Sequence, residues 1–146
     1  MHNVCKGLIV KTSEEGLKKL SAREGRRHRA YLDTKGIPTI GVGHTGPEVY
    51  IGLVWTNSQI DDALADDVVE AEECVNKYVE VPLSQNQFDA LVSFIFNVGV
   101  MAFRRSTLKK VLNTGDYAEA AKCFDMWHKP PEIIGRRDGE REQFLS

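Results

Sequence analysis

The stretch that decides the fold of the N-terminal part reads Glu24-Gly-Arg-Arg-His-Arg-Ala-Tyr-Leu-Asp-Thr-Lys-Gly-Ile-Pro-Thr-Ile-Gly-Val-Gly-His44. Its second half, residues 31–44, combines β-branched residues with glycines and turn formers, which predicts a β-hairpin. We place the turn at residues 34–36, with Gly36 in the left-handed position of a short loop. Residues 14–30 show helical spacing of apolar residues, so we predict a helix that runs into this hairpin.

The rest of the chain is predicted to be mostly helical. Thr56 with Gln59 and Ser84 with Gln87 fit capping boxes, in which a hydroxyl and an amide each satisfy a backbone N–H. Ser106 and Asp116 are further candidate N-caps. We therefore predict an α+β, mostly helical, single domain over residues 1–146. A small N-terminal β-hairpin lobe (14–56) and a helical C-terminal lobe (80–146) are joined by one long helix (57–79), with a cleft between the lobes.

Composition and charge exclude several classes of protein. The chain has 146 residues, 42% hydrophobic and 27% charged, and a net charge of −2, values typical of a globular domain and not of a nucleic-acid-binding protein. The three cysteines, Cys5, Cys74 and Cys123, form no C-x-x-C pair, so we expect free thiols and no zinc site. The apolar runs are too short for a signal peptide or a membrane span, and we expect no stable membrane insertion.

Two carboxylates near the hairpin are candidates for acid–base chemistry. Glu24 lies near the end of the first predicted helix and Asp33 at the end of the first strand, with Thr39 in the second strand. If the hairpin is symmetric about Gly36, Asp33 and Thr39 lie directly opposite each other and can both bind one water molecule. Glycoside cleavage needs two such carboxylates, one that donates a proton and one that stays ionised.

The wider segment resembles the signature of the phage-type lysozymes, the endolysins of glycoside hydrolase family twenty-four. The matching blocks are Glu24-Gly25, Ala30-Tyr-Leu-Asp-Thr34, Gly36 and Thr39-Ile-Gly-Val-Gly-His44. Further blocks that are similar to this family are Leu83 to Gly99, Phe103 with Ser106-Thr-Leu108, Trp127, Gly135-Arg-Arg137, Glu140 and Glu142. The resemblance extends over residues 14–145, nearly the whole chain.

This resemblance implies a muramidase that hydrolyses the β-1,4 bond between N-acetylmuramic acid and N-acetylglucosamine in peptidoglycan. Glu24 matches the general acid, Asp33 the second carboxylate, and Thr39 the residue that helps Asp33 position water. Thr45, Phe96 and Ser106 fall at positions that contact sugar in the family. By analogy the mechanism is inverting, and no cofactor or metal is implied.

The family also suggests how the protein reaches its substrate. Some relatives carry an N-terminal membrane segment, which residues 1–20 cannot form. We therefore expect a monomer that stays in the host cytoplasm until a separate holin releases it to the periplasm and cell wall. Two other functions remain open. A lytic transglycosylase would use an internal sugar hydroxyl in place of water, and a non-catalytic cell-wall-binding or virion protein would use no acid at all.

Two charged features have both a structural and a functional interpretation. The basic run Arg23 to Arg29 is either a solvated face or an attraction to the anionic wall; its arginines lack interleaved aromatics, and we expect no nucleic acid binding. His44 has no second histidine at metal-ligand spacing, so we expect a structural role, paired with Asp66 or Asp67 on the predicted long helix. Phe88 and Phe94 are expected in the core, whereas Phe96 is the phenylalanine expected to reach the cleft.

Overall fold

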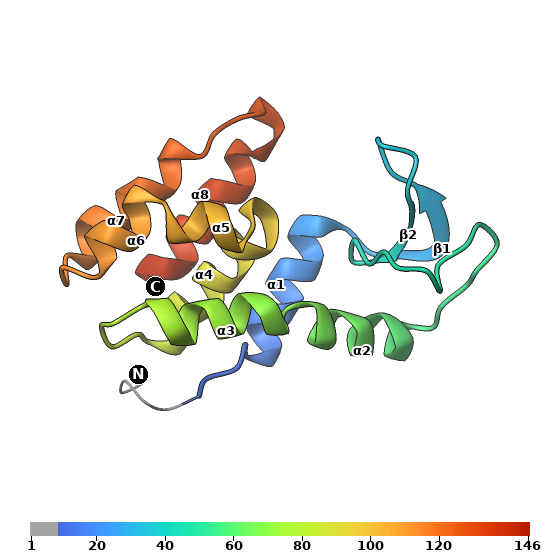
Figure 1. The fold of residues 1–146 in the computed structure, drawn as a ribbon, viewed down its shortest axis with the longest axis horizontal. Coiled ribbons are helices and arrows are strands. Elements are labelled where there is room, and N and C mark those ends of the chain that lie inside the picture. Colours follow the sequence, from blue (N-terminus) through green and yellow to red (C-terminus); the bar gives the residue numbers. More distant parts are fainter. Residues whose placement is uncertain (1–8) are drawn as a thin grey trace. The chain divides into compact units, whose positions relative to one another are not determined.

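The fold is described here from a computed structural model, for residues 9–146 (Figure 1). Helices dominate, and the two strands form one antiparallel sheet, as expected from the sequence. Cys5 lies outside the described residues. Chain contacts divide the molecule into two compact units, Leu17–Val69 (unit 2) and a unit built from the residues up to Gly16 with Glu70–Ser146 (unit 1). Among residues 9–146 no helix is long and apolar enough to cross a membrane.

Unit 2 contains the hairpin predicted from the sequence. It is built from most of α1 (Glu14–Glu24), β1 (Arg27–Leu32), β2 (Pro38–Gly41) and α2 (Asn57–Asp67). The predicted helix over residues 14–30 is too long, because Gly25 takes a φ of +87° and the chain then enters β1. Residues 53–55 pair with the other edge of β1, where the N–H of Ala30 donates to the carbonyl of Leu53 at 3.0 Å.

The register of the hairpin corrects the sequence-based expectation. The N–H of Gly36 donates to the carbonyl of Asp33 at 2.9 Å, and that of Asp33 donates to the carbonyl of Ile37 at 3.0 Å. The three-residue turn is therefore 34–36, as predicted, but its centre is Lys35. Thr39 consequently pairs with Tyr31, not with Asp33. This displacement of two residues leaves Thr39 and Asp33 on the same face, because strand side chains alternate with a period of two.

Unit 1 is the helical unit. Its capping predictions are confirmed: Ser84 forms a capping box with Gln87, and Ser106 and Asp116 cap the two helices that follow them. Its helices and 3-10 turns are all but the first residue of α3 (Val69–Tyr78), α4 (Gln85–Val98), α5 (Val100–Arg104), α6 (Thr107–Leu112), α7 (Tyr117–Cys123), η1 (Phe124–Met126), η2 (Pro131–Ile133) and α8 (Ile134–Leu145). The predicted long helix 57–79 is wrong as one helix, because the chain makes a turn at Val68 between α2 and α3.

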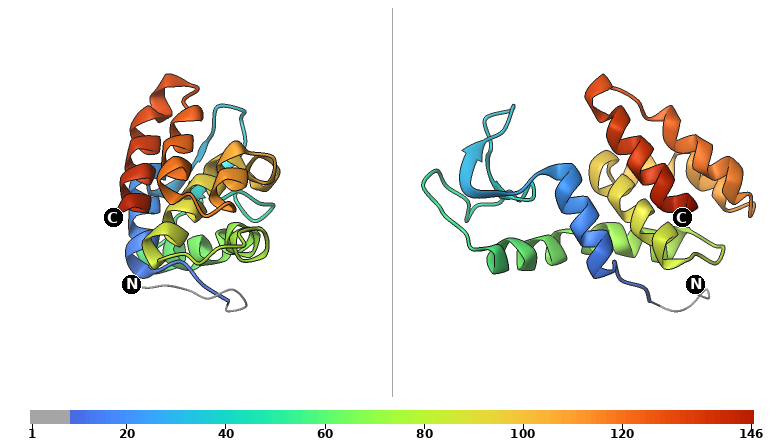
Figure 2. Two further views of the ribbon diagram at one scale, coloured as in Figure 1. Left: turned by 90° about the vertical axis from the view of Figure 1, so that its left-hand side faces the viewer. Right: turned by 180° about the vertical axis from the view of Figure 1, so that it is seen from behind.

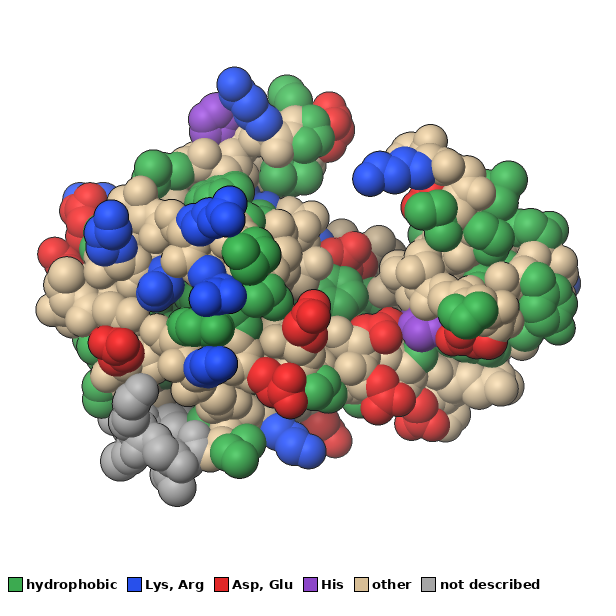
Figure 3. Space-filling model, in the orientation of Figure 1, with side chains coloured by type: hydrophobic (Ala, Val, Ile, Leu, Met, Phe, Trp, Pro, Cys, Tyr) green, Lys and Arg blue, Asp and Glu red, His purple; other side chains and the backbone are tan. Residues whose placement is uncertain are grey.

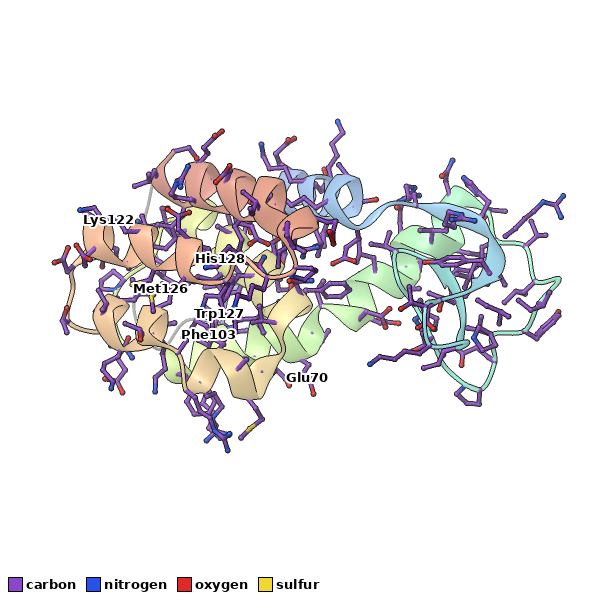
Figure 4. The ribbon with its side chains drawn as sticks, turned by 90° about the horizontal axis from the view of Figure 1, so that it is seen from above. Glu70, Phe103, Lys122, Met126, Trp127 and His128 are labelled. Carbon is purple, nitrogen blue, oxygen red and sulfur yellow. The ribbon has the colours of Figure 1, made fainter. Side chains whose placement is uncertain are left out.

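Helix α4 lies at the centre of unit 1 and packs along α8 (Figure 2). The aromatic ring of Phe94 on α4 contacts those of Phe103, Phe124 and Trp127, at centroid distances of 6.5, 5.3 and 5.6 Å. Figure 4 labels two of these partners, Phe103 and Trp127. Phe88 and Phe94 are both buried, which confirms their expected place in the core. Rings packed edge to face add to the free energy gained from burying their area.

A buried ionic network joins α4 to α8. The carboxylate of Glu140 is fully buried and accepts hydrogen bonds from Arg137, Arg136 and the hydroxyl of Ser93, at 2.7, 3.0 and 2.6 Å. Arg137 also donates to the side chain of Asn97 and to the carbonyl of Trp127. Removing one partner would leave a buried charge uncompensated, so this network fixes how the two helices pack.

Candidate active site in the hairpin unit

Glu24 lies at the end of α1, where a carboxylate is unfavourable for the helix. Cations are the side chains that stabilise a helix C-terminus, because the helix dipole is negative there. The N–H of Gly25 donates to the carbonyl of Ser21 at 2.9 Å, and the positive φ of Gly25 ends the helix directly after Glu24. Helix stability therefore does not explain an acid at this position.

The carboxylate of Glu24 faces the residues that leave β2. A β-carbon built on Gly43 would lie 3.9 Å from Oε1 of Glu24, so the carboxylate reaches the turn after the hairpin. Gly43 itself has a φ of +70°, a conformation that favours glycine. The main chain folds back here through paired hydrogen bonds of 2.9 Å between Ile40 and His44. This tight turn brings the second strand next to the first candidate acid.

Asp33 is fixed by its own turn. Its Oδ1 accepts the N–H groups of Lys35 and Ile37, both at 2.8 Å. Within residues 9–146 both of these hydrogen bonds end on Oδ1, so Oδ2 of the half-buried carboxylate is the atom available to a ligand. An aspartate that binds its turn in this way holds its carboxylate in one orientation.

Thr39 is buried and its hydroxyl is already oriented. Oγ1 donates to the carbonyl of Ile37 at 2.8 Å. Because a threonine hydroxyl has one proton and two lone pairs, Oγ1 can act towards a further partner only as an acceptor. A water molecule at Thr39 would therefore have to donate one of its protons to Oγ1.

His44 links the hairpin to α2, as expected from the sequence. Its Nδ1 lies 2.7 Å from Oδ2 of Asp67 and its Nε2 lies 2.6 Å from Oε2 of Glu48. Burial alone would lower the pKa of His44, but the hydrogen bonds to Glu48 and Asp67 outweigh it and raise the pKa above its usual 6.5. The hydrogen bond from His44 lowers the pKa of Glu48. The pairing with Glu48 was missed, although its spacing of four residues was a local signal.

The three expected sugar-contacting residues are divided between the two units. Thr45 is exposed and directly follows His44 in unit 2. Phe96 is half-buried near the end of α4 in unit 1. Ser106 is buried at the N-cap of α6, where its hydroxyl donates to the carbonyl of Phe103 at 2.7 Å and accepts the N–H of Lys109 at 3.1 Å. Like Thr39, Ser106 could therefore only accept a further hydrogen bond.

The described residues show no cluster of histidines, cysteines and carboxylates that could hold a metal ion. The site consequently has to be judged on its carboxylates and hydroxyl. Asp33 and Thr39 come from one face of the hairpin, and Glu24 comes from the helix that precedes it. An acid, a second carboxylate and a hydroxyl acceptor are a set that can cleave a glycosidic bond.

Comparison with known proteins identifies the family. The model of the phage lysozyme family matches residues 21–140. The endolysin of Salmonella phage P22 is 42% identical over 146 residues, covering 94% of this chain and 100% of that protein. The crystal structure of a P22 lysozyme point mutant gives a TM-score of 0.89 at 41% identity, covering 94% of this chain and 99% of the other.

A second solved structure supports the same conclusion. The muramidase domain of SpmX from Asticaccaulis excentricus is 37% identical with a TM-score of 0.86, covering 93% of this chain and 98% of that one. Several SAR-endolysins are also similar, among them that of Escherichia phage Mu at 37% identity over 80% of this chain and 71% of that protein. The family model alone spans well over half of the chain. On sequence and on fold, this chain belongs to the phage lysozyme family.

Proposed function

We propose that the protein is an endolysin that degrades peptidoglycan for host cell lysis by hydrolysing the β-1,4 bond between N-acetylmuramic acid and N-acetylglucosamine. The observation that carries this proposal is the arrangement in unit 2. Glu24 reaches the turn after β2, while Asp33 and Thr39 share one face of the hairpin. Membership of the phage lysozyme family supports the same substrate.

In this proposal Glu24 is the general acid. It donates its proton to the glycosidic oxygen as the bond to the sugar carbon breaks, so that the leaving sugar departs as a neutral alcohol. The position of Glu24 at the end of a helix, where an acid does not stabilise the helix, supports this role. Its carboxylate lies against Gly43, a residue without a side chain that would cover it.

Asp33 and Thr39 hold the attacking water. The proton of Thr39 is bound to Ile37, and Oδ1 of Asp33 is bound to two N–H groups, so the site offers the water two acceptors, Oγ1 of Thr39 and Oδ2 of Asp33. A water that donates a proton to each has its lone pairs directed towards the sugar carbon. Asp33 then takes the proton that the water loses, which gives an inverting hydrolysis.

Thr45, Phe96 and Ser106 are proposed to contact the sugars of the substrate. The exposed hydroxyl of Thr45 can donate and accept, and the half-buried ring of Phe96 can pack against an apolar sugar face. Ser106 can offer only an acceptor, since its proton is bound to Phe103. Its replacement by alanine would also remove the cap of α6, so that variant needs a stability measurement beside its activity.

The test is the products that purified peptidoglycan releases, identified by mass spectrometry. The wild-type chain should release fragments with a reducing muramic acid end. The Glu24→Gln variant, which keeps the shape of the side chain but carries no acidic proton, should release none while its melting temperature stays nearly unchanged. Wild-type activity in that variant would contradict the role of Glu24.

The same measurement separates the alternatives. A lytic transglycosylase would release anhydromuramic ends, because an internal hydroxyl replaces water. If the protein only bound the wall, neither the wild-type chain nor the Glu24→Gln variant would release fragments from peptidoglycan. The presence of two oriented water acceptors favours hydrolysis over both. Asp33→Asn and Thr39→Val should each lower the turnover number, and Thr39→Ser should restore much of it.

Release through a holin and a monomeric state remain predictions about the cell and about solution. Expression of the chain with a holin in the host cytoplasm should cause lysis, and expression of the chain alone should not. Lysis without a holin would contradict the expected route. Light scattering of the purified protein should give the mass of one chain, 16.4 kDa.

A further inference from the structure

Three helices of unit 1 bring cations around one aromatic ring. The guanidinium carbon of Arg104 on α5 lies 4.4 Å from the centroid of Tyr78 on α3, and Nζ of Lys109 on α6 lies 5.9 Å from it. Nζ of Lys77 lies 5.4 Å from the same ring. With Arg105 and Lys110 these residues form what we call the basic face. Figure 3 shows Lys and Arg side chains gathered over this part of the unit.

The α5 and α6 part of the basic face contains no carboxylates, although α3, which contributes Lys77, also carries Glu70 and Glu73. Residues 90–115 contain four bases, Arg104, Arg105, Lys109 and Lys110, and no aspartate or glutamate. Some bases elsewhere in residues 9–146 do form ion pairs, as Arg141 does with Asp125 at 2.7 Å. None of the ion pairs found in the described chain involves a residue of the basic face. Like charges that form no ion pair repel one another, so this face favours an anionic partner.

Helix stability explains only part of the cluster. Lys77, Arg104, Lys109 and Lys110 lie in last helical turns, where cations stabilise the negative end of the helix dipole. That effect does not require the helices to converge on one ring. Nor does it explain Arg105, which follows the end of α5 and is exposed. The convergence is therefore better explained by recognition than by capping.

We propose that the basic face is a second, non-catalytic contact for peptidoglycan, which binds the carboxylates of the stem peptides. This inference rests on the proposed function, because it takes peptidoglycan as the substrate. Arginine binds carboxylates through two parallel hydrogen bonds, and lysines add point charges beside it. The whole chain has a net charge of −2, so attraction to an anionic polymer has to come from a local face.

Other polyanions fit this face less well. A phospholipid surface calls for apolar side chains that insert beside the cations, whereas Met101 is the exposed large apolar residue of α5 and α6. A nucleic acid calls for a ring on which a base can stack, but Arg104 already occupies a face of Tyr78. Carboxylates on flexible peptides need neither feature.

The test compares two variants of equal charge. The basic-face variant carries Arg104→Gln, Lys109→Gln and Lys110→Gln. The control carries Lys18→Gln, Lys19→Gln and Lys122→Gln, which removes three cations elsewhere; Lys18 and Lys19 are exposed, and Lys122 makes only a 3.6 Å surface pair. Binding is measured on ice, at low ionic strength, by sedimentation with purified sacculi, both native and with their carboxylates amidated. Every chain also carries Glu24→Gln, so that sacculi are not consumed.

We expect the basic-face variant to bind native sacculi about tenfold more weakly than the control, as expected for removal of local electrostatic attraction. Amidation should weaken the control by a similar factor and leave the basic-face variant unchanged. When Glu24 is restored in both chains, the basic-face variant should need more sacculi than the control to reach half of its maximal rate. The maximal rate itself should be the same in both. Arg104→Lys with Lys109→Arg and Lys110→Arg keeps the charge and should bind like the control.

The proposal would be overturned if the two variants bound native sacculi equally, or if amidation still weakened the binding of the basic-face variant. It would also be overturned if the basic-face variant lost binding to anionic phospholipid vesicles but bound sacculi as well as the control does. These are binding measurements, so they are independent of the catalytic role of Glu24. Clearing of sacculi by the Glu24→Gln chain would contradict the proposed function and not the basic face.

Discussion

At the scale of single residues, Gly16 shows how a missing side chain can hold a fold together. Asp89 on α4 is buried and accepts hydrogen bonds from both the N–H and the hydroxyl of Ser13. The hydroxyl of Ser13 in turn accepts the N–H of Gly16 at 3.0 Å, which caps α1. A β-carbon on Gly16 would lie 2.5 Å from the carboxylate of Asp89, so only glycine fits between the cap and its support.

Gly16→Ala should therefore lower the free energy of unfolding by about 1–3 kcal/mol, the usual cost of overpacking a filled site. The matched control is Gly135→Ala in α8, where an added β-carbon meets nothing within 4 Å. That change should raise stability by up to about 1 kcal/mol, because alanine favours a helix over glycine. Urea unfolding of both variants checks the pair, and a stable Gly16→Ala chain would contradict the packing described.

His44 gives the stability of the protein a predictable dependence on pH. Its pKa is raised in the folded state, so its contribution is complete below its usual value of 6.5 and is lost as pH rises through the raised value. The pKa of Glu48 is lowered, so its part of the pair is lost as pH falls below 4.5 through the folded value. The His44 pair is thus strongest in mildly acidic solution.

His44→Asn should lower stability near pH 5.5 and by less near pH 9, and because the pair is partly exposed to solvent the loss near pH 5.5 should be about 1 kcal/mol. Melting temperatures across this range measure the difference from the wild type. Asp67→Asn, which removes the partner on α2, should show the same trend. Turnover at a temperature where both chains are folded should change far less, and a variant that loses only turnover would indicate a catalytic histidine.

At the scale of elements, features that depend on residues close in sequence were predictable, whereas the helix break and the pairing of the strands were not. The capping boxes at Thr56 and Ser84 depend on residues three apart, and both are confirmed. No glycine or proline marks the break between α2 and α3 at Val68. The helical spacing of apolar residues on both sides therefore predicted one continuous helix. The hairpin turn was predictable from Gly36, but its register was not, because the centre of a three-residue turn decides which residues pair.

The same distinction applies to the candidate site. The pairing of His44 with Asp67 followed from the expected place of α2, whereas its pairing with Glu48 was missed. Sequence motifs indicated Glu24, Asp33 and Thr39, but not the hydrogen bonds that orient Asp33 and Thr39. Whether the proton of a hydroxyl is already donated depends on the folded main chain, as at Thr39 and Ser106.

The Ser84 cap tests how much one helix end contributes. Ser84 Oγ accepts the N–H of Gln87 at 3.1 Å, and the side chain of Gln87 accepts the N–H of Ser84 at 2.8 Å. Ser84→Ala should lower the free energy of unfolding by about 1 kcal/mol. Ser58→Ala, an exposed position inside α2, should change it by less than about 0.5 kcal/mol. Equal effects in denaturant titrations would show that the cap contributes nothing.

At the scale of the whole molecule, the two units differ in how much core each contains. Unit 1 buries the aromatic cluster around Phe94 together with the Glu140 network. Unit 2 buries aliphatic residues such as Ile40, Val42 and Ile60 around a two-stranded sheet. A segment of this size that buries few large side chains is marginal as an independent fold, so its stability should not exceed that of the helical unit.

Native-state hydrogen exchange followed by mass spectrometry can measure both units in the wild-type chain. The slowest amides should lie in α4 and α8, and no amide of residues 27–55 should exchange more slowly than those. Cys74 and Cys123 provide a second probe, because burial raises the pKa of both thiols and should keep them unreactive in the folded unit 1. In a Cys5→Ser chain, thiol modification should therefore be as slow as exchange in α4. Modification that is faster than exchange in the hairpin would mean that the helical unit opens first, the reverse of what its core predicts.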